Sequence, residues 1–405
     1  MSGLFGVVGF GGEVDLAVLD GMGDVVSHRG PDGVGVWTDA GVGLGCLELW
    51  VSPESVGETG PWVAEDVVVA ADVRLDNRSE LIRSLDSGSG VSDRELLGLA
   101  YRRWGQGCVE RLLGDFAFVI YDRIHHRVLA ARDPMGMRPL YYRSEPKRFL
   151  FGSEVKQILA VPDVPARIFE PAVAGYLTSG ATRLEWSFYE GINQLPPAHL
   201  LLASEDGVRV SRYWEIDPEN QIRYPKEQDY ADHFRELFIE AVRCRTRTDY
   251  PVGIFLSGGM DSGSIASTVG WLRERGEGPK DFRAYNWAFE ELPQCDERHL
   301  SRLVTDHYQI PTTDVWADQA WPLKDYPAHG PDQDEPFIGV YQALIERTLQ
   351  AAQTHDTKVM LSGDRGDLVS GGFVIDYLRM AASGHLKGLL RELRIHHESV
   401  GRASR

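Results

Sequence analysis

The sequence is poor in the features that mark secreted and membrane-spanning proteins. It has only 4 cysteines in 405 residues, without a CxxC pair or a zinc-like spacing, which predicts reduced thiols. It has no uncharged apolar run of about 18 residues and no N-terminal signal segment. We therefore expect a cytoplasmic protein that contacts no membrane. The cysteines are Cys46, Cys108, Cys244 and Cys295.

An excess of basic residues is also missing. The chain has 42 Lys and Arg against 60 Asp and Glu, and its net charge is −18. This balance argues against a nucleic-acid-binding protein that works through a broad basic face. The remaining composition, 43% hydrophobic and 25% charged residues, is typical of globular proteins, and the length favours two domains.

Residues 1–205 are expected to form a layered α+β domain, because they contain many short strand-like segments bounded by Gly, Asp, Pro or Ser. One helix interrupts them. Ser92 is predicted to cap its start, Glu95 completes a capping box, and Gly105 ends it. The strand-like segments are 4–10, 65–75, 114–122, 127–133, 140–143, 149–154 and 199–204.

The pattern changes after the polar, proline-bearing segment 206–226, which is predicted to be a linker. In the second domain, 227–405, helical and strand patterns alternate, which favours an α/β domain with a parallel sheet. The expected helices are 229–246, 262–276, 296–308 and 339–353, and the expected strands are 251–259, 282–289 and 358–363.

The strongest chemical motif is SGGMDS at residues 257–262, between a predicted buried strand and a helix. Consecutive glycines let backbone N–H groups approach an anion, and the helix directs its positive end to the same point. Asp261 fits a phosphate site only if it holds a divalent cation, since it would otherwise repel the anion. A purely structural tight turn is the alternative. The predicted phosphate-binding residues are Leu256, Ser257, Gly258, Gly259, Asp261 and Ser262.

This loop is not of the Walker type, because the chain has no GxxxxGK[ST] motif. It resembles the pyrophosphate loop (PP-loop) of ATP pyrophosphatases, which split ATP between its α and β phosphates to make an adenylate. A second acidic loop, SGDRGD at 362–367, follows another predicted strand, with Gly371 and Gly372 shortly after. The carboxyl ends of neighbouring strands face one crevice. Ser362 and Gly363 are thus further predicted ATP-binding residues, and Asp261 and Asp367 could share one Mg²⁺.

These motifs form part of an ordered set that resembles the asparagine synthetase family from residue 1 to about 380. The resemblance implies a glutaminase domain of the N-terminal nucleophile hydrolase type, followed by a PP-loop synthetase domain. The synthetase domain would use ATP and Mg²⁺ to adenylate a carboxylate and then amidate it. The further motifs are MSGLFGVVGF, SHRGPDGVGVW, LDNRSEL, SDREL, LLGDFAFVIYD, ARDPMGMRPLYY, FGSEVKQIL, LPPAH, CDERHLSRLV and DQDEPF.

The first half departs from the family pattern. Glutamine-using members begin with Cys after Met removal, whereas this chain would begin with Ser2, a poorer nucleophile. The family binds the glutamine carboxylate with Arg in an RLS motif, and the corresponding stretch here contains Glu48, which would repel that carboxylate. The stretch that forms the oxyanion site in the family corresponds here to ADVRLDN, which differs from the family pattern. Asn77 and Asp93 persist, so Ser2, Asn77 and Asp93 are interpreted as parts of a degenerate glutaminase kept as scaffold.

Without its own ammonia source, the synthetase half must use an amine carried by its substrate, or free ammonia. Members with such a glutaminase include β-lactam synthetases and lasso peptide cyclases. The motifs of this sequence are most similar to those of lasso peptide cyclases. The resemblance implies a macrolactam-forming ligase whose substrate is a precursor (core) peptide, with a leader peptidase and a leader-recognition protein as partners. The alternatives are an asparagine synthetase or other ammonia-dependent amide ligase, and a non-catalytic nucleotide-binding partner subunit.

Two acids are candidates for taking the proton of the attacking amine, Asp364 and Glu335, because each lies beside a matched motif. Either could instead be a hydrogen-bonding residue around the site. Family members continue well beyond the second acidic loop, whereas 33 residues follow Gly372 here. From this we expect a chain that is truncated, completed by another polypeptide, or inactive.

Overall fold

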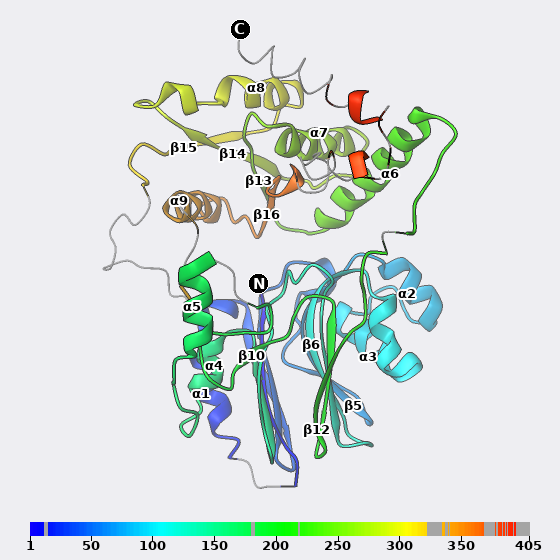
Figure 1. Ribbon diagram of the computed structural model, residues 1–405, viewed down its shortest axis with the longest axis vertical. Coiled ribbons are helices and arrows are strands. Elements are labelled where there is room, and N and C mark those ends of the chain that lie inside the picture. Colours follow the sequence, from blue (N-terminus) through cyan, green and yellow to red (C-terminus); the bar gives the residue numbers. More distant parts are fainter. Residues whose placement is uncertain are drawn as a thin grey trace.

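The computed structural model describes residues 1–11, 15–179, 183–217, 219–321, 334–336, 339, 341–367 and separate positions between 377 and 393. Two domains are stacked along the long axis of the molecule, and the N-terminus lies near their junction (Figure 1). Strands β1 to β12 belong to the first domain and β13 to β16 to the second. Within the part of the chain that is described, no helix is both long and apolar enough to cross a membrane.

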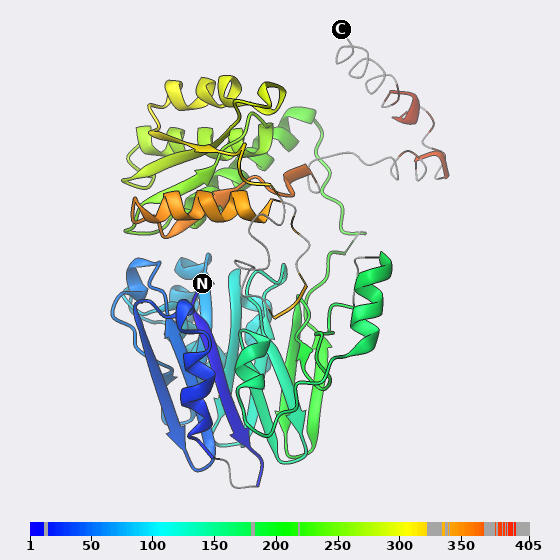
Figure 2. The same cartoon turned by 90° about the vertical axis from the view of Figure 1, so that its left-hand side faces the viewer.

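The first domain contains two antiparallel sheets packed face to face (Figure 2). Apolar side chains from both sheets, such as Leu4 and Val119, meet between them and are fully buried. The first sheet has the order β10-β8-β9-β1-β3-β2 and the second β12-β11-β7-β6-β5-β4. The strands are β1 (Gly3–Gly9), β2 (Gly33–Asp39), β3 (Val42–Glu48), β4 (Trp62–Val63), β5 (Val67–Leu75), β6 (Gly114–Asp122), β7 (Arg127–Arg132), β8 (Tyr141–Glu145), β9 (Arg148–Gly152), β10 (Asn193–Gln194), β11 (His199–Ser204) and β12 (Gly207–Arg212).

Helices cover the outer face of each sheet, so the domain has four layers. Helices α1 (Val18–Asp24) and α4 (Val155–Leu159) pack on the first sheet through a separate apolar cluster that includes Phe5. Helices α2 (Arg78–Leu85) and α3 (Asp93–Trp104) cover the second sheet. This arrangement confirms the predicted layered α+β domain; a further helix is α5 (Glu170–Ser179).

The predicted N-cap and the predicted end of α3 are confirmed, whereas the reciprocal hydrogen bond that would complete a capping box is described at α4 and not at α3. The Ser92 side chain accepts a hydrogen bond from the Glu95 N–H at 3.2 Å, and Gly105 ends the helix with a positive φ of 58°. The expected linker needs adjustment at its start, because β12 pairs with β11 along its whole length. Residues 207–212 are therefore part of the second sheet.

The second domain contains a parallel sheet of order β15-β14-β13-β16, as the alternating pattern predicted. Its core includes Ile254 and Ala266, both fully buried between the sheet and the helices. The strands are β13 (Val252–Phe255), β14 (Phe282–Ala288), β15 (Thr312–Trp316) and β16 (Val359–Ser362), and the helices are α6 (Glu227–Arg245), α7 (Met260–Glu274), α8 (Arg298–His307) and α9 (Gln342–Gln353).

Polar contacts join the two domains at the end of α6. Arg245 forms an ion pair with Asp115 of β6 and lies 3.2 Å from Asp76. Thr248 donates a hydrogen bond to the Val51 carbonyl at 2.6 Å. These contacts connect the end of α6, shortly before β13, to the strand ends of the first domain.

The four cysteines are free thiols, as predicted. Burial raises the pKa of the Cys46 and Cys108 thiols to about 12. A buried thiol in apolar surroundings is inert, so these two residues act as core side chains.

Candidate functional site

The loop between β13 and α7 is held in shape by its own serines. Ser257 donates its N–H to Ser262 Oγ at 3.2 Å, and the two hydroxyl oxygens are 2.9 Å apart. Ser257 Oγ also accepts a hydrogen bond from the Gly259 N–H at 3.1 Å. Helix α7 begins at the next residue, so the predicted combination of loop glycines and a helix N-terminus is present.

Gly258 lies at the narrowest point of this loop. A Cβ atom at this position would be 2.7 Å from Leu300 Cδ1, so only glycine fits without displacing α8. The Gly258 N–H donates to Glu297 Oε2 at 2.9 Å. An anion bound by the loop backbone would therefore replace the Glu297 carboxylate at this amide.

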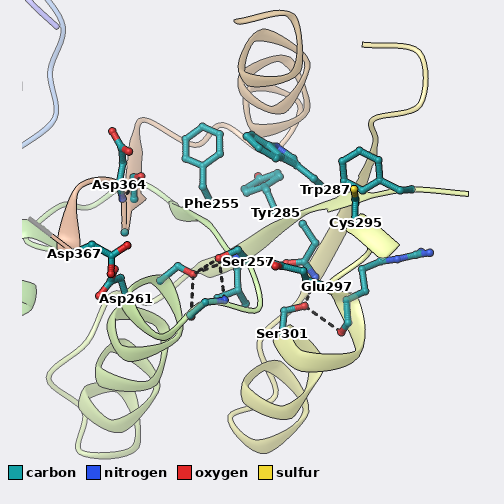
Figure 3. A pocket seen from close by; sticks show the side chains of 18 residues that line it. Phe255, Ser257, Asp261, Tyr285, Trp287, Cys295, Glu297, Ser301, Asp364 and Asp367 are labelled. Carbon is teal, nitrogen blue, oxygen red and sulfur yellow. Dashed lines mark hydrogen bonds between the residues drawn. The ribbon is translucent and has the colours of Figure 1, made fainter. Parts of the chain in front are cut away.

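The second acidic loop lies against the first. A Cβ atom on Gly363 would be 2.5 Å from the Ser262 nitrogen, and one on Gly366 would be 2.6 and 2.8 Å from the Asp261 carboxylate oxygens. Asp261 and Asp367 accordingly lie beside one another in Figure 3. Gly371 and Gly372 lie outside the described residues.

The two aspartates suit Mg²⁺, which prefers oxygen ligands, binds through one or two carboxylates and keeps several waters and phosphate oxygens. In the described ranges, no group of three or more His, Cys, Asp or Glu side chains is arranged to hold a metal ion. The donor set therefore fits a cation that arrives with a nucleotide better than a permanently bound structural metal.

A cavity of about 360 Å³, the nucleotide cavity, opens beside the two loops. Four aromatic side chains form part of its wall, Phe255, Tyr285, Trp287 and Phe289, and Figure 3 shows the first three above Ser257. Trp287 is fixed because its indole N–H donates to Thr348 Oγ1 at 3.0 Å. The predicted residues that line the cavity are Leu256, Ser257, Gly259, Asp261, Ser262, Ser362, Gly363, Asp364 and Asp367.

Sequence reasoning did not identify the aromatic wall. Tyr285, Trp287 and Phe289 are spaced by two residues in and just after β14, which places their side chains on one face of the strand. This alternation was the available signal. Glu297, Arg298 and Ser301 of the region around α8 also line the cavity.

The two candidate proton acceptors are in different places. Asp364 lines the nucleotide cavity. Glu335 does not line it; burial raises the pKa of its carboxyl, and nearby Asp334 raises it further. The Asp334 carboxylate accepts a hydrogen bond from the Lys156 N–H at 3.0 Å, so this segment contacts the first domain.

At the degenerate glutaminase site, Glu48 is bound internally. Its two carboxylate oxygens accept hydrogen bonds from the two terminal nitrogens of Arg94 at 3.1 and 3.0 Å, and from the Gly60 N–H at 3.1 Å. Glu48 is 2% and Arg94 4% exposed. Ser2 lies beside this pair, where its hydroxyl accepts from the Leu49 N–H at 3.1 Å.

Asn77 and Asp93 make structural contacts. Asn77 donates to the Arg111 carbonyl at 2.9 Å and accepts from the Leu113 N–H at 3.0 Å. Asp93 is paired with Arg78, although burial raises the pKa of its carboxyl. Neither lines the cavity that contains Ser2, so the structure does not assemble the three residues into one pocket.

Together, the four-layer domain with Ser2 near its start and the parallel-sheet domain with a PP-loop define an amidotransferase-type domain joined to a synthetase domain. The family model described as a glutamine amidotransferase domain matches residues 1–214. The model described as asparagine synthase matches residues 233–401. The chain belongs to the asparagine synthetase family.

Several curated relatives share most of this chain. Glutamine-hydrolyzing asparagine synthetase 3 of Bacillus subtilis is 33% identical over 402 residues, which are 92% of this chain and 63% of the relative. Putative glutamine-hydrolyzing asparagine synthetase 2 of Methanocaldococcus jannaschii is 29% identical over 92% of this chain and 76% of its own length. Amidase chry2 of Gibberella zeae is 29% identical over 70% of this chain and 44% of its own length. The chain thus spans less than two thirds of the first of these relatives.

Proposed function

We propose that this protein is an AMP-forming carbon–nitrogen ligase that adenylates a side-chain carboxylate of a peptide. It then closes a macrolactam with the N-terminal amine of the same peptide, as lasso peptide cyclases do. The observation that carries this proposal is the buried Glu48–Arg94 pair. In glutamine-using members the corresponding stretch binds the carboxylate of glutamine. Here it contains a carboxylate of the protein itself. An amine carried by the substrate would then replace ammonia from glutamine.

The activation step would take place in the nucleotide cavity. Backbone N–H groups of residues 257–259 and the hydroxyls of Ser257 and Ser262 would bind the pyrophosphate portion of ATP while the peptide carboxylate attacks the α-phosphorus. Asp261 and Asp367 would hold Mg²⁺, whose chemistry is to offset the negative charge that develops on the departing pyrophosphate. The aromatic wall leaves an apolar, water-poor surface for the remaining part of the nucleotide and the acyl group.

The second step joins the amine to the acyl-adenylate. The amine nitrogen attacks the acyl carbon, the bond from that carbon to the phosphate oxygen of AMP breaks, and the amine loses a proton. Asp364 lines the cavity and can accept this proton. Holding both ends of one peptide in the site removes much of the entropic barrier to ring closure.

An ammonia-dependent asparagine synthetase is the second candidate, because the relatives from Bacillus subtilis and Methanocaldococcus jannaschii are named as glutamine-hydrolyzing asparagine synthetases and the glutaminase site of this chain is degenerate. This candidate requires aspartate to be adenylated in the nucleotide cavity without any peptide. Both candidates place ATP in the same loop and differ in the acyl substrate and the amine.

The experiment that separates them supplies ATP and Mg²⁺ with either a leaderless core peptide or aspartate and ammonium. A peptide product lighter by one water, with release of AMP and pyrophosphate, supports the macrolactam ligase. Asparagine formation supports the second candidate. ATP binding without pyrophosphate release under both conditions would identify a nucleotide-binding partner subunit.

The proposed pathway also includes a peptidase that removes the leader of the precursor peptide and a protein that recognises this leader. We place all of them in the cytoplasm, where ATP is supplied. Pull-down of the purified chain with each partner, compared with the Asp261→Ala variant, tests whether their association depends on the nucleotide site.

A further inference from the structure

A second cavity, the inter-domain cavity, has a volume of about 710 Å³ and lies between the two domains. Ser2, Glu48 and Met137 of the first domain line it, together with residues 358–362 along β16. Ser362 and Asp364 line both this cavity and the nucleotide cavity. The loop that follows β16 is therefore the common wall between the place of adenylate formation and a space that extends to the former glutaminase site.

The inter-domain cavity is much larger than the volume that an ammonia molecule occupies. A molecule of the size of water occupies about 30 Å³ in the liquid, so this cavity has room for a segment of several amino-acid residues. Its end in the first domain contains the Glu48–Arg94 pair, whose hydrogen bonds are made within the protein. The Glu48–Arg94 pair therefore offers glutamine no free charged partner, and the space is open to another occupant.

The lining carries charges of both signs, which suits a peptide with a free amine and backbone carbonyl groups. Asp72 faces Arg138 with 3.5 Å between Oδ1 and Nε, and this Nε has no hydrogen-bond partner among the described residues. Such a loose pair leaves the carboxylate able to bind an ammonium group. The charged lining residues are Glu48, Glu58, Asp72, Arg74, Arg94, Asp115, Arg138, Arg245, Lys358, Asp364 and Arg365.

We propose that the inter-domain cavity binds the amine-bearing end of a peptide substrate and presents its nitrogen to the acyl-adenylate across the Ser362–Asp364 wall. This inference rests on the proposed ligase function. The carboxylate-bearing residue enters the nucleotide cavity, and the amine reaches the acyl carbon from the other side. The new C–N bond forms as the bond to AMP breaks, and Asp364, at the wall, takes the proton of the amine and releases it to solvent.

The test fills the inter-domain cavity without touching the nucleotide cavity. Met137 is 55% exposed and lines the inter-domain cavity, whereas Met135, two residues earlier, is 66% exposed and does not line it. Met137→Trp is compared with the matched control Met135→Trp. Each variant is given ATP, Mg²⁺ and core peptide, and macrolactam is measured. Hydroxylamine is added in parallel, because it is small enough to capture the acyl-adenylate as a hydroxamate without the peptide amine.

We expect macrolactam formation by Met137→Trp to fall about 100-fold, as misplacement of a reacting group does, while its hydroxamate formation matches that of the control. Equal cyclisation by the two variants would overturn the cavity assignment. Absence of hydroxamate from the unmodified protein would instead overturn the proposed ligase function.

A labelling measurement keeps the assignment testable if Met137→Trp is unstable. Cysteine is placed at position 137 or, as the control, at 135, and its rate of alkylation is followed by peptide mapping, because Cys295 is also exposed. Core peptide should protect Met137→Cys but not Met135→Cys, and ATP alone should protect neither. Unchanged alkylation at 137 with saturating peptide would contradict binding in this cavity.

Discussion

Lys358 of the second domain donates hydrogen bonds to both carboxylate oxygens of Asp32 in the first domain, at 2.9 and 3.1 Å. Its Nζ also donates to the Trp50 carbonyl at 3.3 Å and lies 4.1 Å from the centre of the Tyr250 ring. Asp32 belongs to the HRGPDG motif, and Lys358 directly precedes β16. The motif therefore anchors the strand that leads to the second acidic loop.

Replacing Lys358 by Met should loosen the two domains. Hydrogen bonds to charged groups contribute about 1.5–3 kcal/mol each. The Lys358–Asp32 contact is only partly exposed, because 22% of the Lys358 side chain is accessible. We expect the unmodified protein to unfold in one thermal transition and Lys358→Met to unfold in two, with the second domain unfolding first. Scanning calorimetry of Lys358→Met against Lys280→Met, an exposed lysine of the same domain, measures this. A single unshifted transition would show that the contact is not needed for coupling.

The Glu48–Arg94 pair predicts a strong stability effect. Arg94→Met leaves the buried Glu48 charge without its partner and should lower the free energy of unfolding by about 3–5 kcal/mol. The double variant Glu48→Leu with Arg94→Met removes both charges and should recover most of this loss. Urea denaturation of the two variants gives the comparison. Equal losses in both would mean that the effect comes from packing and not from the unpaired charge.

The same pair predicts that a thiol at the N-terminus does not restore glutamine hydrolysis. Ser2→Cys supplies the better nucleophile, but the Glu48 carboxylate, held by Arg94, still lies in the stretch that we propose corresponds to the glutamine-binding RLS motif. We expect no release of glutamate above background once mass spectrometry has confirmed removal of Met1. Glutamate release by Ser2→Cys alone would overturn our interpretation of Glu48 as the residue that closes this site.

Local sequence signals were sufficient for much of the architecture. Three signals depend on residues close in sequence: the Ser92 cap, the Gly105 helix end, and the alternation of strand and helix patterns around β13 and β14. The structure contains the elements that they predicted. The two loops also met as expected, because parallel strands place their carboxyl ends on the same edge of a sheet.

The features that sequence reasoning missed depend on long-range pairing. Strands β2 and β3 contain four glycines and were not predicted, yet their residues pair in register from Gly33↔Glu48 to Asp39↔Val42. Gly45 is needed because a Cβ atom there would be 2.2 Å from the Phe5 ring. Likewise, nothing local indicates that Glu48 meets Arg94, 46 residues away, or that Lys358 meets Asp32.

Metal dependence gives a prediction for the nucleotide cavity. Asp261→Ala removes one of the two carboxylates proposed to hold Mg²⁺ and should reduce AMP formation at least about 100-fold, as should chelation of the metal. Asp20→Ala, an exposed position on α1, is the control and should retain full activity. AMP formation is measured with any accepted carboxylate and hydroxylamine. Full activity of Asp261→Ala would remove Asp261 from the proposed metal site.

Glu335 leads to a prediction about pH. Burial, assisted by the Asp334 charge, raises the pKa of its carboxyl above the ordinary value of 4.5. The folded state therefore binds this proton more tightly than the unfolded state, and stability decreases as pH rises from 4.5 through the raised pKa. Glu335→Gln removes this effect, because the neutral amide has no charge to bury. We expect the melting temperature of Glu335→Gln, relative to that of the unmodified protein, to increase as the pH rises from about 4 to 8.

The control for Glu335→Gln is Glu190→Gln, at an exposed position of the first domain. Its melting temperature should follow that of the unmodified protein at every pH. If the Glu335→Gln difference does not change with pH, the carboxyl is ionised equally in both states. The Glu335 Oε1 atom, which has no hydrogen-bond partner among the described residues, would then have to gain one in solution. Such a partner would stabilise the charged form and cancel the cost of burial.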